Sequence, residues 1–291
     1  MLKTAIIGAS GYIGKHLLEM YRKKYPNSIG TYFKNKNFKN KYFDICNSDI
    51  KKLKLFETGH KSVIITAAQP LIGFCEKNPK DSYKLNVKAP LKIIKELSKT
   101  PIKIIFLSSD YVFQGNKAIN SDLDKTNPTT VYGKQKKEVE EKIKKISKDI
   151  LVLRLGKIFG LKKGDGTLLD QSAKLLIKKK EVSAATDQYF CPTLIHDLTE
   201  VINKIQLSNL KGIVNVCSDE IYSRYDLNIS LAKALNINNK FVKKINLQDL
   251  PNFKKRPLNT SMNCIKLKKS INHKFKPVSE SIRIIAKNYK L

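Results

Sequence analysis

Three side chains in the first half of the chain could together reduce a carbonyl group or oxidise an alcohol. Tyr132 and Lys136 are four residues apart, so on a helix they share one face. An ammonium beside a phenol favours the phenolate, which predicts that the pKa of Tyr132 falls below its usual value of about 10. Ser109 supplies a hydroxyl that can bind a carbonyl oxygen. The trio predicts hydride transfer with a nicotinamide cofactor, with Tyr132 as the proton donor and Lys136 bound to the ribose.

A glycine-rich loop at the start of the chain has the spacing of a dinucleotide site. Gly8, Gly11 and Gly14 follow a short apolar run and open a segment with helical periodicity over residues 12–23. One glycine allows a tight turn, one lets the backbone approach a pyrophosphate, and one packs the helix against the strand. We expect this loop to bind the cofactor through Gly8, Ser10, Gly11, Tyr12, Ile13 and Gly14.

The second strand predicts which nicotinamide cofactor is used. Proteins that bind NAD usually place an acid after this strand, on the ribose 2′-hydroxyl. Residues 30–35 contain no acid, and Tyr32 is followed two residues later by Lys34. We therefore expect NADPH, with Tyr32 and Lys34 at the cofactor and Lys34 on its 2′-phosphate. NADH stays an alternative, because lysines are abundant throughout the chain.

The elements that must position these residues alternate between strands and helices. Apolar runs predict strands over residues 4–8, 28–33, 62–68, 102–107 and 150–155, and helices are expected over 12–23, 80–98 and 131–146. This alternation predicts an α/β fold with a Rossmann-type, doubly wound parallel sheet. Ligands of such sheets bind beyond the carboxyl ends of the strands, where Gly8, Ala67, Ala68, Ser108 and Ser109 are expected.

The alternation becomes irregular after about residue 156. Helices are expected over residues 167–179, 197–205, 223–235 and 279–289, with a strand over 213–217. We expect an NAD(P)-binding Rossmann domain from residues 1–158 plus about 194–218. Residues 159–193 and 219–291 would form a smaller, C-terminal substrate-binding region.

Composition excludes several classes of function. The 291 residues carry a net charge of +31, but only five of the 56 basic residues are arginine, namely Arg22, Arg154, Arg224, Arg256 and Arg283. Sites that read nucleic acids depend on arginine, so we expect no nucleic-acid partner. No apolar run is long enough to span a bilayer and the first residues do not resemble a secretory signal, which predicts a cytoplasmic protein without a membrane partner. Five widely spaced cysteines predict neither disulfides nor a metal site.

Several motifs, in the right order, resemble the extended short-chain dehydrogenase/reductases. More narrowly, they are similar to the branch that contains dTDP-4-dehydrorhamnose reductases. The matching segments are residues 108–115 (SSDYVFQG), 127–136 (NPTTVYGKQK), 187–193 (DQYFCPT), the pairs Cys75-Glu76 and Arg256-Pro257, and residues 85–87 (LNV).

The resemblance implies reduction of the 4-keto group of a nucleotide-linked 6-deoxyhexose with NAD(P)H. It implies further cofactor contacts at Asp44, Ile45, Ala67, Ala68 and Asn86, with Ser108 beside them, and substrate contacts at Ser109, Gln188 and Arg256. A homodimer is common in this superfamily. Residues 69–74 lack the polar loop of the branch, which favours a sugar other than 4-keto-rhamnose.

Two alternatives stay open from the sequence. The first is an epimerase with tightly bound NAD, because such enzymes use the same trio. The second is a non-catalytic subunit, since the regulatory subunit of methionine adenosyltransferase resembles this branch too. A dehydratase is disfavoured, because Asp110 is followed by Tyr111 where those enzymes carry an acidic pair.

Overall fold

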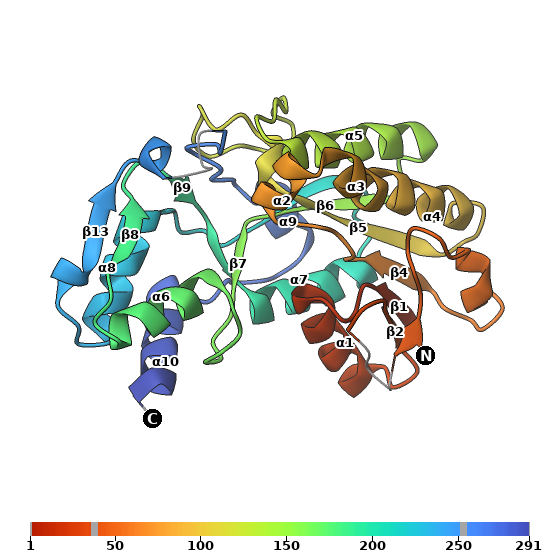
Figure 1. Ribbon diagram of the computed structural model, residues 1–291. Coiled ribbons are helices and arrows are strands. Elements are labelled where there is room, and N and C mark those ends of the chain that lie inside the picture. Colours follow the sequence, from red (N-terminus) through yellow and green to blue (C-terminus); the bar gives the residue numbers. More distant parts are fainter. Residues whose placement is uncertain (1, 36–39, 251–254, 291) are drawn as a thin grey trace. The chain divides into compact units, whose positions relative to one another are not determined.

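The largest sheet among the described residues has seven strands, in the order β11-β6-β5-β4-β1-β2-β3 (Figure 1). The structure is a computed structural model, and it describes residues 2–35, 40–250 and 255–290. Strand β1 pairs in parallel with β2 on one side and β4 on the other, and β4 pairs in parallel with β5. The order of the strands therefore reverses beside β1, which is where doubly wound sheets bind ligands. The strands of this sheet are β1 (Thr4–Ile7), β2 (Ile29–Tyr32), β3 (Lys41–Tyr42), β4 (Ser62–Ile65), β5 (Lys103–Ser109), β6 (Leu151–Leu155) and β11 (Gly212–Val216).

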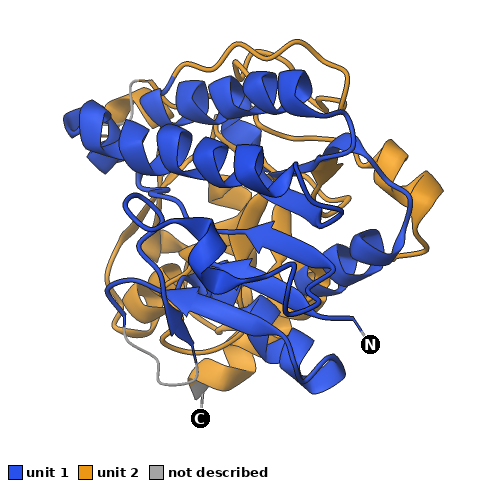
Figure 2. Cartoon of the chain, turned by 90° about the vertical axis from the view of Figure 1, so that its right-hand side faces the viewer, with its two compact units in different colours: residues 1–112, 130–154, 199–214 blue, residues 113–129, 155–198, 215–291 orange. Residues whose placement is uncertain are grey.

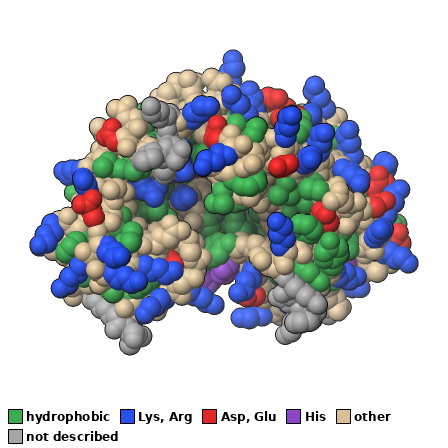
Figure 3. Space-filling model, in the orientation of Figure 1, with side chains coloured by type: hydrophobic (Ala, Val, Ile, Leu, Met, Phe, Trp, Pro, Cys, Tyr) green, Lys and Arg blue, Asp and Glu red, His purple; other side chains and the backbone are tan. Residues whose placement is uncertain are grey.

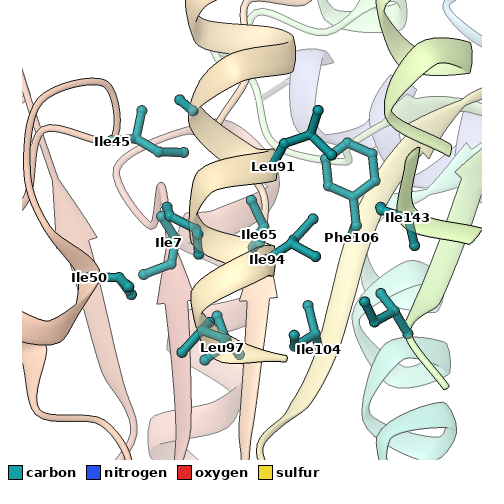
Figure 4. Packing of buried hydrophobic residues seen from close by; sticks show 14 of the residues in the cluster. Ile7, Ile45, Ile50, Ile65, Leu91, Ile94, Leu97, Ile104, Phe106 and Ile143 are labelled. Carbon is teal, nitrogen blue, oxygen red and sulfur yellow. The ribbon is translucent and has the colours of Figure 1, made fainter. Parts of the chain in front are cut away.

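Helices cover both faces of the sheet, as the sequence predicts for a Rossmann-type fold. Figure 1 shows α1 (Tyr12–Lys24) and α7 (Ile195–Leu207) on one face, and α4 (Ala89–Leu97) and α5 (Val131–Ile146) on the other. Ile7, Ile65 and Phe106, in aligned positions of β1, β4 and β5, are buried against Ile94 of α4 and Ile143 of α5 (Figure 4). Strands buried on both faces consist almost wholly of apolar residues, which explains the continuous apolar runs in the sequence.

The helix expected over residues 80–98 is interrupted by a wider turn. The structure has α3 (Pro79–Tyr83), then a π-helical turn (Lys84–Lys88), then α4. Pro90 has no N–H to donate to the carbonyl of Asn86, so the regular i to i−4 ladder cannot continue there. The amide of Ala89 instead bonds the carbonyl of Lys84, five residues back. The wide turn contains Asn86, one of the predicted cofactor residues.

The chain divides into two compact units, drawn in blue and orange in Figure 2. The first comprises residues 1–112, 130–154 and 199–214, and the second comprises residues 113–129, 155–198 and 215–291. These bounds differ from the expected domains chiefly at residues 113–129, which cluster with the second unit. The reason is backbone hydrogen bonding between this segment and the C-terminal part of the chain. The amide of Asn259 donates to the carbonyl of Gly115, and the amide of Asn120 donates to the carbonyl of Ser261.

The second unit has its own core under three short, two-stranded sheets. Leu169 of α6, Leu231 of α8 and Ile282 of α10 are buried together in it. The paired strands are β7 with β10, β8 with β13, and β9 with β12. The elements of this unit not yet given are β7 (Lys157–Phe159), α6 (Leu168–Ile177), β8 (Val182–Ala185), β9 (Tyr189–Phe190), β10 (Pro192–Leu194), β12 (Tyr222–Ser223), α8 (Arg224–Ala234), β13 (Val242–Ile245), α9 (Ile265–Ser270) and α10 (Val278–Lys290).

Two features of the composition can be followed in the structure. The lysine and arginine side chains are spread over the face shown in Figure 3 and do not gather in one patch. Cys191, Cys217 and Cys264, far apart in the sequence, are buried side by side in the second unit, and the sulfurs of Cys217 and Cys264 are 3.2 Å apart. Among the helices of the described residues, none is both long and apolar enough to cross a membrane.

Candidate active site

The glycine loop has a backbone that only glycine allows at two of its positions. Gly8 directly follows β1 with a φ of +91°, and a Cβ atom there would lie 2.7 Å from the backbone of Ala67. A Cβ atom on Gly14 would collide with the carbonyl oxygen of Gly8. Gly11 is the N-cap of α1 and has no side chain to bond the first amides of that helix. These amides, at the positive end of the helix dipole, therefore suit the phosphates of a dinucleotide.

The other residues predicted at the cofactor lie around the ends of β2, β3 and β4. Lys34 is exposed just beyond β2, and Tyr32 packs edge-on against Tyr42 of β3, with ring centroids 5.7 Å apart. The carboxylate of Asp44 accepts hydrogen bonds from the amide of Cys46 and the side chain of Asn47. Ile45 is buried in the core, and Ala67 lies against Gly8. The fold thus brings these residues to the edge of the sheet that carries the glycine loop.

The three residues predicted to be catalytic come from two neighbouring elements, β5 and α5. Ser109 is the last residue of β5, and Tyr132 and Lys136 lie in the first two turns of α5. Thr130 caps this helix by accepting a hydrogen bond from the amide of Gly133 at 3.1 Å. The Ser109 hydroxyl donates to Asp110 at 2.9 Å and lies close enough to the Tyr132 phenol to influence its pKa. The three side chains that could polarise and protonate a carbonyl group therefore do come together.

Lys136 is directed at the backbone of β5 and at two aromatic rings. Its ammonium donates to the carbonyl oxygen of Leu107 at 2.8 Å and lies 4.5 Å from the centre of the Phe106 ring. The centre of the Tyr132 ring is 5.7 Å away. The side chain is 3% exposed, and burial lowers the pKa of Lys136 to about 8, against the opposing influence of Glu140 and Cys75.

The expected direction of the pKa shift of Tyr132 is wrong. Burial raises the pKa of the Tyr132 phenol well above its usual value, and the nearby Asp110 adds to this rise. The hydroxyl of Ser109 opposes this rise without cancelling it. The sequence shows that a lysine lies one turn away, but it cannot show that the ammonium is bonded to Leu107 or how deeply the phenol is buried. Tyr132 is therefore a neutral phenol at ordinary pH, which is the form that donates a proton.

Asn86 is buried and uses its amide to fix the loop that follows β4. Its side-chain oxygen accepts from the amide of Gln69 at 2.8 Å, and its nitrogen donates to the carbonyl of Gln69 and to Gln135 on α5. Just after this loop, α2 (Ile72–Lys77) packs on the start of α5, where the carboxylate of Glu76 accepts from the amide of Val131 at 2.7 Å. The predicted contact of Asn86 with the cofactor stays a prediction, while its contacts in the structure support the loop.

Ser108 points into the protein and meets two charged residues that the sequence analysis did not select. Its hydroxyl donates to the carboxylate of Glu140 at 2.6 Å, and Glu140 is paired with Arg154 of β6. Both charged side chains are almost completely buried. The sequence did contain one signal of this pair. Arginine is rare in the chain, and Arg154 stands inside an apolar strand, where a charged side chain is unexpected. Any contact of Ser108 with a cofactor would have to use its backbone.

Gln188 and Arg256, predicted at the substrate, belong to the second unit. The side chain of Gln188 is 6% exposed, and its amide oxygen has no hydrogen-bond partner among the described residues. The backbone oxygen of Gln188 accepts from the amide of Arg224, at the start of α8. Arg256 is half-buried and precedes Pro257, which packs against Gly115. The amide oxygen of Gln188 can therefore accept a hydrogen bond from a water molecule or a ligand.

Comparison with known proteins identifies relatives over nearly the whole chain. The family model described as the RmlD substrate binding domain matches residues 2–291. Methionine adenosyltransferase 2 subunit beta of Xenopus tropicalis is 24% identical over 278 residues, which are 92% of this chain and 82% of that protein.

Solved structures with the same fold are found at similar identity. A dTDP-4-dehydrorhamnose reductase of Clostridium acetobutylicum is 24% identical with a TM-score of 0.86, and the match covers 100% of both chains. The dTDP-4-dehydrorhamnose reductase of Bacillus anthracis, solved in complex with NADP, is 22% identical with a TM-score of 0.85, covering 97% of this chain and 98% of that one. These likenesses confirm the predicted Rossmann-type fold.

Proposed function

The chain belongs to the RmlD substrate binding domain family, and from that premise we propose that it is an NADPH-dependent oxidoreductase. Its proposed reaction is the reduction of the 4-keto group of a nucleotide-linked 6-deoxyhexose. The observation that carries this proposal is the assembly of Ser109, Tyr132 and Lys136 at the end of β5 and the start of α5. The solved reductases that share the fold support it.

The residues of the site fit the proposed reaction in the direction of reduction. When bound, NADPH supplies the hydride that is added to the carbonyl carbon. The Tyr132 hydroxyl would donate a hydrogen bond to the carbonyl oxygen, where negative charge develops, and the Ser109 hydroxyl, which here donates to Asp110, would turn to do the same. Because its pKa is raised, Tyr132 still carries its proton and passes it to this oxygen, which as an alkoxide is a far stronger base than a phenolate. The ammonium of Lys136 then offsets the charge left on Tyr132.

The proposed preference for NADPH depends on Lys34. We expect Lys34→Ala to weaken NADPH binding about three- to fivefold, since an exposed charge contact is worth up to about 1 kcal/mol. NADH lacks the 2′-phosphate, so its affinity should not change. Titrations followed by nicotinamide fluorescence measure both affinities, with Lys92→Ala on the exposed face of α4 as the control. Equal affinity of the unaltered protein for NADH and NADPH would contradict this preference.

Gln188 and Arg256 are proposed to bind the nucleotide end of the substrate. The buried oxygen of Gln188 can accept a hydrogen bond from an N–H or O–H group of the ligand. The guanidinium of Arg256 has the planar geometry that binds a diphosphate through two hydrogen bonds. The two residues therefore suit the base or ribose and the diphosphate of a nucleotide sugar.

The identity of the sugar is open because of the loop after β4. Leu71 is 65% exposed and Phe74 is 39% exposed, where the related branch carries polar residues. Leu71 directly precedes α2, and Phe74 lies in it. Ile72 and Cys75 of the same helix pack directly on Tyr132. We propose that these exposed apolar side chains, so near in sequence to the residues that pack on Tyr132, favour a sugar with a less polar face than 4-keto-rhamnose.

A second candidate function is that of a non-catalytic subunit. The curated relative from Xenopus tropicalis is a methionine adenosyltransferase subunit, and its match covers 92% of this chain. Under this proposal the chain would form a stable complex with a catalytic methionine adenosyltransferase subunit and would not turn over keto-sugars. An epimerase with tightly bound NAD is the remaining enzyme alternative, and purification of the protein with NAD already bound would favour it.

The deciding experiment follows the oxidation of NADPH by its absorbance. The substrate is a 4-keto-6-deoxy nucleotide sugar that a dehydratase generates in place, with and without a 3,5-epimerase. Consumption of NADPH establishes the ketoreductase, and its dependence on the epimerase reports the configuration of the sugar. Absence of consumption, with NADPH still bound, would contradict the proposal for these sugars. Gel filtration with a catalytic methionine adenosyltransferase subunit would then test the second candidate.

A further inference from the structure

Three consecutive residues at the end of β5 are matched to three residues spaced along α5. The carbonyl of Leu107 accepts from Lys136, the hydroxyl of Ser108 donates to Glu140, and the hydroxyl of Ser109 influences the pKa of Tyr132. Tyr132, Lys136 and Glu140 follow each other at intervals of four residues and so lie on one face of the helix. The proposed chemistry uses only the first two of these three. Glu140 has no role in it so far.

Glu140 is held by a second charged residue, from β6. Arg154 donates through Nε to both carboxylate oxygens of Glu140 at 3.1 Å, and through Nη2 to Oε2 at 2.7 Å. The exposed fractions of the two side chains are 2% for Glu140 and 3% for Arg154. The Ser108 hydroxyl and the Arg154 guanidinium together hold the carboxylate against β5 and β6. Glu140 itself lies one helical turn after Lys136 on the same face of α5.

We propose that Glu140 and Arg154 are positioning residues, which fix a negative charge beside Lys136 and thereby keep its ammonium charged in a buried site. The proposal rests on the proposed function in that it assigns the charge of Lys136 a part in binding the nicotinamide ribose. Arg154 orients the carboxylate of Glu140, and Ser108 ties it to the strand that ends at Ser109.

Burial makes such a fixed charge necessary. Removing an ammonium from water disfavours its charged form, and among the described residues the direct partners of Lys136 are one carbonyl and two aromatic rings. The Glu140 carboxylate counteracts this by raising the pKa of Lys136. An apolar pair of the same size at positions 140 and 154 would pack at least as well, because buried ion pairs add little stability in themselves. The charges are better explained by their effect on Lys136.

Other titratable groups act on Lys136 and Tyr132 from positions different from that of Glu140. Cys75 on α2 also raises the pKa of Lys136, but it does so less strongly than Glu140. Asp110, directly after β5, acts on Tyr132, and Tyr111 packs edge-on against the ring of Tyr132. Arg154 faces Glu140 from β6. Removing the carboxylate of Glu140 would therefore leave Lys136 with burial and a nearby guanidinium, which both favour the neutral amine.

The test measures the dissociation constant of NADPH by fluorescence between pH 7 and 9.5. Over this range the 2′-phosphate of the cofactor is already dianionic, since phosphate monoesters have a second pKa of about 6. We expect affinity to fall as the pH rises through the pKa of Lys136, about 8. In Glu140→Gln this fall should begin about one pH unit lower, because a charge pair at this range contributes about that much. Glu140→Asp, which keeps the charge, should restore the position of the fall.

Matched variants separate this effect from loss of the fold. Glu141→Gln removes the same charge from the adjacent position of α5, where the side chain is 57% exposed, and should leave the pH profile unchanged. If Glu140→Gln does not fold, the double variant Glu140→Gln/Arg154→Gln strands no buried charge and should show a displacement in the same direction but smaller, because the guanidinium near Lys136 is removed as well.

The outcomes distinguish this proposal from the proposed reaction, because binding is measured without any sugar. Equal pH profiles for the unaltered protein and a folded Glu140→Gln or double variant would overturn the positioning role, even if keto-sugars are reduced. A displaced profile would support it, even if no keto-sugar is reduced.

Discussion

We expect Tyr132→Phe to bind NADPH normally and to lose turnover by roughly a hundred- to ten-thousand-fold, the usual contribution of a positioned general acid. Phenylalanine fills the same space against Ile72 and Cys75, so the helix and the cofactor site should remain intact. The variant lacks only the hydroxyl that lies near Ser109 and carries the proton. Comparison of kcat from NADPH oxidation with the dissociation constant from fluorescence separates the two effects.

Tyr83→Phe is the matched control for this substitution. The hydroxyl of Tyr83 also bonds α5, donating to Glu138 at 2.6 Å, but it takes no part in the trio. The Tyr83→Phe variant should have a kcat close to that of the unaltered protein. Substantial turnover by Tyr132→Phe would show that another group supplies the proton.

The second large effect is expected at Lys136. Lys136→Met keeps the length of the buried side chain but removes the ammonium, and we expect both weaker NADPH binding and a kcat reduced by roughly a hundredfold or more. In the unaltered protein, kcat/KM should decline as the pH rises through about 8, because the ammonium, whose pKa is lowered by burial, then loses its proton. The raised pKa of Tyr132 keeps the phenol protonated over the same range, so this decline reports Lys136.

The pH profile of Lys136→Met provides the check. Its residual activity should show no decline near pH 8, since the titrating group is absent. A decline that persists unchanged in this variant would assign it to a different group and would contradict the role given to the ammonium.

The sequence predicted the elements that carry the trio well, because their signals are local. The helix expected over residues 131–146 is observed with the same bounds, and the apolar strand before Ser109 is observed as β5. The apolar pattern of each segment predicts its element, and the threonine before the helix marks where the helix begins. The glycine loop was equally readable, since only glycine tolerates the backbone at Gly8 and the contact at Gly14.

Features that depend on contacts between distant segments could not be read from the sequence. The pairing of Glu140 with Arg154 joins a helix to a strand, and nothing in the spacing of the two residues indicates it. The direction of the pKa shift of Tyr132 depends on burial by Ile72 and Cys75, from a segment some 60 residues earlier. The two-residue strands β9 and β12 are too short to produce a periodic signal, so only helices were expected for the second unit.

The way the loop after β4 is fastened has a consequence for how this protein could change its substrate over evolutionary time. The amide of Asn86 fixes the loop at Gln69, and Glu76 fixes the end of α2 to the first turn of α5. Between these two anchors lie the exposed side chains of Leu71 and Phe74. Mutations at these two positions would change exposed side chains while the anchors of the loop and of α2 stay in place. Under the proposed function, a lineage could thus exchange one sugar for another without altering the residues proposed to carry out the reaction.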